Sequence, residues 1–277
     1  MSLLPLPEPY DFELSTERFR AFGPDLANLW YEGGVHRVVG AREIRIEAAR
    51  GGVDVEPLDE KTEPVARAMV GADFELAPFY EWAKGDEVLR GLVPKLAGFR
   101  PPLAPDPYET LVSAISAQQV SLFAAFAVRN RMVERFGVQG IRAYAFPTLE
   151  RMAGADEEQL TELGFSRRKA EYVIGVARSD VDFEALRKLP DEEVKATLTA
   201  IRGLGEWTAD WFLARHLARP HAWPAGDLGV VKAVSAFYFE GRKLAIAEVR
   251  EFGERLHPFQ NLSAHYLLTG HRVAPPA

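Results

Sequence analysis

Nine residues, Ile201-Arg202-Gly203-Leu204-Gly205-Glu206-Trp207-Thr208-Ala209, join two stretches of helical hydrophobic spacing through a turn that is too short for anything but a sharp hairpin. Gly203 and Gly205 permit positive φ and close approach of a ligand. The turn presents successive N–H groups at the start of a helix predicted from Thr208, where the helix dipole adds to their attraction for an anion such as a DNA phosphate. The alternative is a corner between two helices that binds nothing.

A second feature ends in Asp227, twenty residues after Trp207. The Pro/Gly loop Trp223-Pro224-Ala225-Gly226-Asp227 delivers one carboxylate to the start of an apolar helix. Asp227 can be a plain N-cap of that helix. A helix N-terminus also favours the ionised carboxylate, and an anion here can stabilise the oxocarbenium-like sugar that forms when an N-glycosidic bond breaks. Capping and catalysis are therefore compatible roles for this residue.

The composition is that of a globular protein. With 277 residues and 47% hydrophobic content, the chain can bury a core in two or three compact units. It has no apolar run of roughly 20 residues and no signal-peptide pattern, so we expect a cytoplasmic protein without membrane association. The absence of cysteine excludes disulfides and cysteine-ligated iron–sulfur clusters.

Charge is unevenly distributed along the chain. A net charge of −7 argues against a protein that coats nucleic acid through excess Lys and Arg. Residues 1–100, however, hold 18 acidic against 12 basic side chains, whereas residues 101–277 hold 22 against 21. The acidity therefore belongs to the first third, and a hairpin that binds phosphate through backbone N–H groups needs little positive charge.

Hydrophobic periodicity divides the chain into a mixed N-terminal part and a helical remainder. Residues 34–56 combine β-branched residues, period-two alternation and a Gly51-Gly52 turn, which predicts a hairpin or meander. The proline-rich segment 99–107 forms a stiff boundary. We therefore predict an α+β fold, with a small antiparallel sheet and helices in a domain spanning residues 1–100 and an all-α domain spanning residues 101–277.

Apolar spacing of 3.6 residues predicts most of the helices. They are expected at residues 60–69, 76–83, 87–96, 108–119, 122–136, 147–153, 157–163, 167–178, 192–201, 208–217, 228–239, 246–255 and 262–268. Three polar residues can act as N-caps: Ser166, Asp191 and Asp227.

Taken together, the hairpin, its spacing to the loop that ends in Asp227, and the following apolar helix resemble the helix-hairpin-helix, Gly/Pro-Asp signature of base-excision DNA glycosylases. Within that superfamily the chain is most similar to the 3-methyladenine-DNA glycosylase II family. Matching segments include residues 9–12, 117–121, 146–148 and 163–171. The resemblance implies an N-terminal sheet like that of the TATA-binding protein, an all-α helix-hairpin-helix glycosylase fold, and Asp227 as the catalytic carboxylate.

The residue next to the hairpin distinguishes the chemistries of the superfamily. Members that also cleave the strand carry a nucleophilic Lys where this chain has Trp207. Without that amine no Schiff base can form there, so the resemblance implies a monofunctional enzyme that uses water as nucleophile. The absence of cysteine removes the iron–sulfur branches of the superfamily. We expect hydrolytic excision of alkylated bases from duplex DNA during base excision repair, leaving an abasic site.

The resemblance also assigns a base-binding pocket. Trp207 and Trp211 match aromatic pocket positions, where indole faces would attract a cationic base by roughly 0.5–2 kcal/mol, although core packing also explains such a pair. Gln119 matches the residue that wedges into the duplex, often Leu in related enzymes, although it could belong to an ordinary polar loop. Leu268 stands where a pocket Trp is expected, which implies a more open pocket.

Contacts with DNA and a cation follow from the same resemblance. Four hairpin residues would contact DNA: Gly203, Gly205, Glu206 and Thr208. Three backbone carbonyls could ligate a monovalent or divalent cation that bridges the hairpin to a phosphate: those of Thr199, Ile201 and Leu204. Residues 167–169 are expected to form a solvated helix face, with phosphate contact as the alternative. We expect a monomer that acts on duplex DNA containing alkylated bases and requires no cofactor.

Two other functions remain open at this point. A catalytically silent helix-hairpin-helix protein could bind damaged DNA, but it would gain nothing from the anion of Asp227 facing a phosphodiester. A glycosylase with lyase activity on oxidised bases is disfavoured by Trp207.

Overall fold

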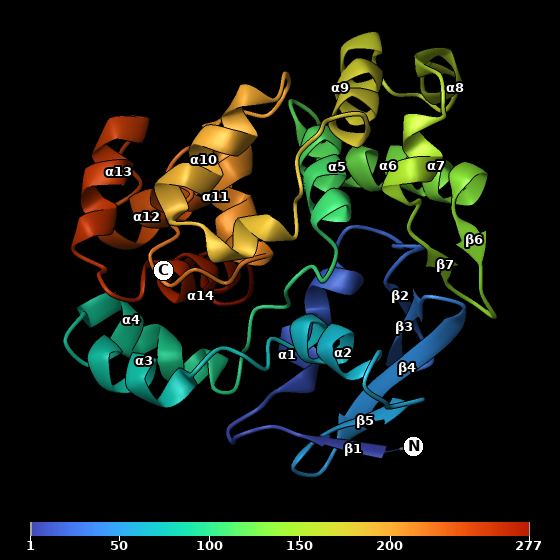
Figure 1. Cartoon of the computed structure of the whole chain (residues 1–277). Helices are drawn as coiled ribbons and strands as arrows, with labels where there is room; N and C mark the ends of the chain where they lie inside the picture. The colour runs from blue at the N-terminus through green and yellow to red at the C-terminus, as the bar shows by residue number, and fades with distance from the viewer. Residues whose placement is uncertain (1, 277) are drawn as a thin grey trace.

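The computed structural model of the chain describes residues 2–276. It has the predicted α+β architecture, with one antiparallel sheet near the N-terminus and helices over most of the remaining chain (Figure 1). Five strands form the sheet in the spatial order β1-β5-β4-β3-β2: β1 (Ser2–Pro5), β2 (Leu29–Tyr31), β3 (Gly34–Val39), β4 (Arg42–Ala49) and β5 (Gly52–Glu56). The meander predicted for residues 34–56 is confirmed as β3, β4 and β5.

The strand alternation places one face of the sheet in a small core. Ile44, Ile46, Val53 and Val55 are fully buried, and Ile46 pairs with Val55 across neighbouring strands. Because successive strand residues point to opposite faces, these alternate positions share one side of the sheet. Two short helices, α1 (Phe12–Thr16) and α2 (Glu63–Met69), supply further residues of this core.

The predicted helices are all present, with ends shifted by a few residues. They are α2, α3 (Leu76–Ala83), α4 (Glu87–Leu92), α5 (Pro107–Ala117), α6 (Leu122–Phe136), α7 (Leu149–Ala153), α8 (Glu157–Glu162), α9 (Arg167–Ala177), α10 (Asp191–Ala200), α11 (Glu206–Arg215), α12 (Leu228–Tyr238), α13 (Ile246–Glu254) and α14 (Gln260–Val273). Three 3-10 turns accompany them: η1 (Glu17–Phe19), η2 (Val93–Leu96) and η3 (Ala185–Lys188).

Two details of the helix starts correct the prediction. Pro190, not Asp191, is the N-cap of α10; Asp191 is the first helical residue and pairs with Arg219 at 3.1 Å. The helix predicted from Thr208 begins earlier, at Glu206. Ser166 and Asp227 are confirmed as N-caps.

A short ribbon interrupts the region that we expected to be all-helical. Strands β6 (Val138–Gln139) and β7 (Tyr144–Ala145) pair with each other. The loop between them is fixed by Glu43 of β4, whose Oε2 accepts hydrogen bonds from the N–H groups of Arg142 (2.7 Å) and Ala143 (3.0 Å). A carboxylate almost 100 residues earlier in the sequence therefore stabilises this ribbon.

The larger core extends across the predicted boundary near residue 100. Buried side chains from α3, α4 and the following segment pack with α12 and α14, and Figure 1 shows α3 and α4 away from the sheet. Arg100 is buried near this boundary. Its backbone N–H donates to Ser15 Oγ of α1 at 3.0 Å, and its guanidinium donates to the carbonyls of Pro7 (3.1 Å) and Phe74. The division of the chain at residue 100 stays a prediction. No helix within residues 2–276 is long and apolar enough to cross a membrane.

Candidate active site

A cavity of about 880 Å³ lies between η1 and the helices α5, α6, α11, α12 and α14. It brings together side chains that are far apart in the sequence. Asp227 lines it, and so do the four residues that we expected to bind the substrate: Trp207, Trp211, Gln119 and Leu268. Their roles toward a base stay predictions, but the structure places all of them around one space.

Asp227 is held through both carboxylate oxygens. Its Oδ1 accepts from the N–H groups of Gly229 (2.8 Å) and Val230 (3.1 Å), which is the N-cap arrangement. Its Oδ2 accepts from the indole Nε1–H groups of Trp207 (2.9 Å) and Trp211 (3.0 Å). All four partners can only donate, so the side chain acts purely as an acceptor and its orientation is fixed.

The two tryptophans therefore serve the carboxylate as well as the cavity wall. Trp211 is buried, and the Arg215 guanidinium lies 3.7 Å above its ring, while the His265 ring centroid is 5.6 Å away. One face of the Trp211 ring already carries a cation, so a cationic base would have only the other face available, and the role of this ring toward a base stays a prediction. Trp207 is half-buried and lines the cavity.

Sequence analysis did not predict three residues that line the cavity: Arg18, Arg215 and His265. Burial lowers the pKa of Arg215 well below its ordinary value, and the positive charge of Arg18 adds to this effect. Burial also lowers the pKa of Arg18 to about 10. The pKa of the buried His265 ring falls well below its usual value through burial and then through Arg215 and Arg18, so this ring is neutral. The i,i+4 spacing of Trp211 and Arg215 was the only local signal for any of these residues.

A buried ion network forms part of the cavity wall. Arg37 pairs with Glu109 at 2.8 Å, and Arg129 pairs with Asp25. Asn28 donates to Glu109 Oε1 at 2.7 Å. These groups come from the N-terminal part and from α5 and α6, so the network joins the two parts of the molecule and shapes the cavity between them.

The hairpin residues differ in backbone conformation. Gly203 has φ +96°, and a Cβ there would lie 2.2 Å from Cγ of Tyr172, so glycine is required. Gly205 has φ −107°, which any residue adopts, and a Cβ there would have no neighbour within 4 Å. Of the two glycines that permit positive φ, only Gly203 adopts it. The space around Gly205 is open, so a ligand from outside the chain can approach its backbone closely.

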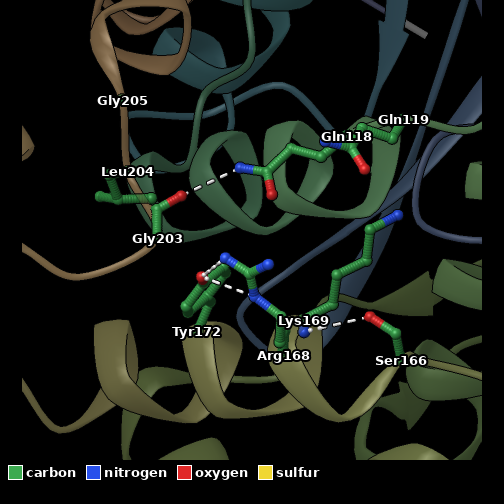
Figure 2. A pocket seen from close by; sticks show the side chains of 9 residues that line it. All are labelled: Gln118, Gln119, Ser166, Arg168, Lys169, Tyr172, Gly203, Leu204 and Gly205. Atoms are coloured by element: carbon green, nitrogen blue, oxygen red, sulfur yellow. Dashed lines mark hydrogen bonds between the residues drawn. The ribbon is translucent and has the colours of Figure 1, made fainter.

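The hairpin lies beside the expected wedge residue. Gln118 donates from Nε2 to the Gly203 carbonyl at 2.9 Å, and the exposed Gln119 has φ +58°. Figure 2 shows both residues facing the first turn of α9 across a cavity of about 420 Å³. Arg168 and Lys169 line this smaller cavity. The basic segment that we expected to be a solvated face is therefore partly turned toward the hairpin.

Free N–H groups cluster at the start of α11. The N–H groups of Gly205, Glu206 and Trp207 donate to no described residue, as is usual in the first turn of a helix. Thr208 is different, because it is buried and its N–H donates to the Gly205 carbonyl at 3.0 Å. The DNA contact expected for Thr208 stays a prediction. The side chain of Glu206 pairs with Arg250 at 2.9 Å.

The expected cation ligands are backbone carbonyls of this same hairpin. The Ile201 carbonyl accepts the N–H of Leu204 at 3.1 Å, and the Thr199 hydroxyl donates to the Lys195 carbonyl at 2.7 Å. Within residues 2–276 there is no cluster of three or more acidic or His side chains suited to a metal ion. Any cation here would depend on backbone oxygens.

Comparison with known proteins connects this geometry to a family. The family model described as HhH-GPD superfamily base excision DNA repair protein matches residues 112–258, which include the hairpin and Asp227. A DNA-3-methyladenine glycosylase of Bacillus subtilis is 32% identical over 203 residues, covering 70% of this chain and 67% of that protein. DNA-3-methyladenine glycosylase 2 of Escherichia coli is 26% identical over 241 residues, covering 80% and 82%.

Solved structures agree with the sequence matches. The 3-methyladenine DNA-glycosylase from Archaeoglobus fulgidus has a TM-score of 0.87 and 29% identity, covering 99% of both chains. The superposition extends over both the sheet and the helical part. This chain belongs to the HhH-GPD superfamily of base excision DNA repair proteins.

Proposed function

We propose that the protein is a monofunctional DNA glycosylase that excises alkylated bases from duplex DNA by hydrolysis, leaving an abasic site. The observation that carries this proposal is the position of Asp227, a carboxylate fixed by four N–H donors in the wall of the 880 Å³ cavity and adjacent to the hairpin. The names of the relatives support alkylated bases as the substrate class.

Asp227 would act on the sugar rather than on the base. When the bond between C1′ and the base nitrogen breaks, its electron pair leaves with the base and positive charge develops on the sugar. A fixed anion stabilises that charge without reorganising. Water then adds to C1′ and loses a proton, which the carboxylate or solvent can accept. A cationic alkylated base leaves as a neutral molecule, so the enzyme mainly has to flip it, hold it and stabilise the sugar.

A lyase mechanism lacks a nucleophile at this site. Trp207 occupies the position where strand-cleaving members carry Lys, and its indole N–H is engaged with Asp227. None of the described residues that line the 880 Å³ cavity is a lysine. Schiff-base formation needs such an amine, so water is the nucleophile that we propose.

DNA would bind across the hairpin and the smaller cavity. The free N–H groups at the start of α11 can bind one phosphate, and Arg168 and Lys169 lie on the opposite side of that cavity. Neither basic side chain forms an ion pair with a described residue; Arg168 contacts only the Tyr172 hydroxyl, at 3.1 Å, and Lys169 donates to the Ser116 carbonyl at 2.8 Å. Both charges are therefore available for the DNA backbone.

Three further properties belong to this proposal. The enzyme would act as a cytoplasmic monomer. A monovalent or divalent cation on the carbonyls of Thr199, Ile201 and Leu204 would strengthen the phosphate contact of the hairpin, and the chemistry itself would require no cofactor.

The direct test compares wild type with Asp227→Asn on duplex DNA carrying methylated purines, with abasic sites revealed by alkali. We expect release by the wild type and a rate roughly 10²–10³-fold lower for the variant. Asp191→Asn is the matched control, because Asp191 pairs with Arg219 and does not line the cavity. Equal release by wild type and Asp227→Asn, or no release of any methylated base by the wild type, would overturn the proposal.

The structure suggests one complication in this test. In Asp227→Asn an amide NH₂ would face the two indole N–H groups, so donors would oppose donors. Trp207→Phe and Trp211→Phe added to Asp227→Asn would remove that conflict. A rate lower in this triple variant than in the double variant Trp207→Phe, Trp211→Phe would assign the difference to the missing charge. Binding without release by the wild type would instead identify a silent damage binder. A complex trapped with borohydride would contradict the monofunctional mechanism.

A further inference from the structure

Two guanidinium groups in the wall of the 880 Å³ cavity have no acidic partner. Arg18 comes from η1 and Arg215 from the end of α11, and both line the cavity. Neither forms a hydrogen bond or ion pair with any residue in the described range 2–276, and Nε of Arg215 is buried without an acceptor. Guanidinium groups stay protonated at neutral pH, so this wall carries positive charge.

The other charges around the cavity are paired, which makes these two exceptional. The pairs are Asp25 with Arg129, Glu109 with Arg37, and Glu17 with Arg272. His265 lies in the same wall and is neutral. Among the described carboxylates that line the cavity, Asp227 alone forms no ion pair with a basic side chain, and it is the carboxylate that the proposed reaction uses to stabilise the sugar.

The position of Arg215 directs its positive charge toward the space for the base rather than toward the sugar. Its guanidinium stacks on Trp211 at 3.7 Å, and the indole N–H of Trp211 points to Asp227. Arg215 is only half-buried and lines the cavity, so its exposed part faces the space that a flipped base would enter. Charges in a site shielded from water act more strongly than in bulk solvent.

We propose that Arg215, assisted by Arg18, recognises the departing base and selects lesions by the charge with which they leave. This inference rests on the proposed glycosylase function. When a neutral damaged base such as hypoxanthine departs, the electron pair of its bond to C1′ makes it an anion, which the guanidinium groups stabilise. Water then adds to C1′ and its proton reaches the base. A cationic base such as 7-methylguanine leaves neutral and gains nothing from these groups.

The test measures single-turnover excision of hypoxanthine and of 7-methylguanine, each placed in the same duplex. Arg215→Met keeps the apolar contact with Trp211 and removes the charge. We expect it to lower the ratio of the hypoxanthine rate to the 7-methylguanine rate by at least about tenfold. Arg215→Lys keeps a positive charge and should restore most of the hypoxanthine rate. Arg255→Met is the matched control, since Arg255 stacks on Tyr238 and Phe252 outside the cavity.

The ratio of the two rates separates this role from a structural one. If Arg215 only supported Trp211, both rates would fall together in Arg215→Met, and that result would overturn the inference. Arg18→Met gives a second measurement should Arg215→Met unfold, and it should shift the ratio in the same direction. A wild type that releases 7-methylguanine but no hypoxanthine would overturn the inference and leave the proposed function standing. Failure to release either base or any other methylated base would overturn both.

Discussion

Replacing Gly205 with alanine should leave the fold intact and weaken DNA binding. Gly205 has φ −107°, and the new Cβ would meet no atom within 4 Å. Gly205 is the N-cap of α11, where alanine is worse than glycine by roughly 0.5–1 kcal/mol. Alanine also reduces the conformational entropy of the unfolded chain, which stabilises the fold by about 0.4–1 kcal/mol. The two effects therefore nearly cancel in the free energy of unfolding.

The loss in DNA affinity follows from the free N–H groups at this position. A phosphate bound to the N–H groups of Gly205, Glu206 and Trp207 must approach the backbone closely, and the methyl group of alanine would displace it. One hydrogen bond to a charged group contributes about 1.5–3 kcal/mol. We therefore expect the dissociation constant to rise roughly 10- to 150-fold.

Gly203→Ala is the matched comparison, because it makes the same substitution in the same hairpin at a position where glycine is required. Its φ of +96° costs a non-glycine residue about 1–2 kcal/mol, and the Cβ would lie 2.2 Å from Tyr172 Cγ. Displacing that ring adds about 1–3 kcal/mol, as overpacking does elsewhere. This substitution should therefore lower the free energy of unfolding, in contrast to Gly205→Ala.

Urea unfolding and fluorescence anisotropy with a duplex containing an abasic-site analogue, at one fixed salt concentration, measure the two effects separately. Unchanged affinity in Gly205→Ala would refute phosphate binding by the hairpin N–H groups. A loss of stability in Gly205→Ala as large as in Gly203→Ala would refute the conformational argument.

Three more predictions concern stability and DNA contacts. Burial lowers the pKa of His216 to about 4, so the fold favours the neutral ring; stability should be full above pH 6.5 and fall by up to about 3 kcal/mol as the pH drops toward 4. Urea titrations of His216→Asn should show a flatter pH dependence, and an unaltered curve would contradict this. Arg168→Gln should reduce the slope of log affinity against log salt by about 0.9 in binding titrations, whereas an unchanged slope would exclude a phosphate contact. Glu109→Gln leaves Arg37 and Arg129 short of an acceptor and should cost about 3–5 kcal/mol in urea unfolding; a loss under 1 kcal/mol would show that the network is dispensable.

Local features of the sequence determined most of the secondary structure. Helix spacing, glycines and capping residues act over three or four positions, and a local pattern suffices to predict them. Ser166 and Asp227 cap α9 and α12 as expected, and the hairpin lies between α10 and α11. One of the errors was also local: Pro190, and not Asp191, is the N-cap of α10.

The resemblance to a family identified the candidate residues of the site but did not predict how they interact with one another. Nothing in the spacing of Trp207 and Trp211 showed that their N–H groups point to Asp227. Residue type also left the φ of Gly205 undetermined, because glycine permits either sign and the packing of the hairpin decides which one is adopted.

Only the tertiary structure decided the charge of the cavity. Arg18 lies in the N-terminal part and Arg215 nearly 200 residues later, yet they line one wall with Asp227. Likewise, Glu43 fixes a ribbon around residues 142 and 143, which helical periodicity did not predict. Side chains separated by this distance in sequence meet through packing of whole elements, and no local pattern records which charges will be left without a partner. The sequence by itself therefore determined the elements, the hairpin and the catalytic candidate, while packing determined the electrostatic environment in which that carboxylate acts.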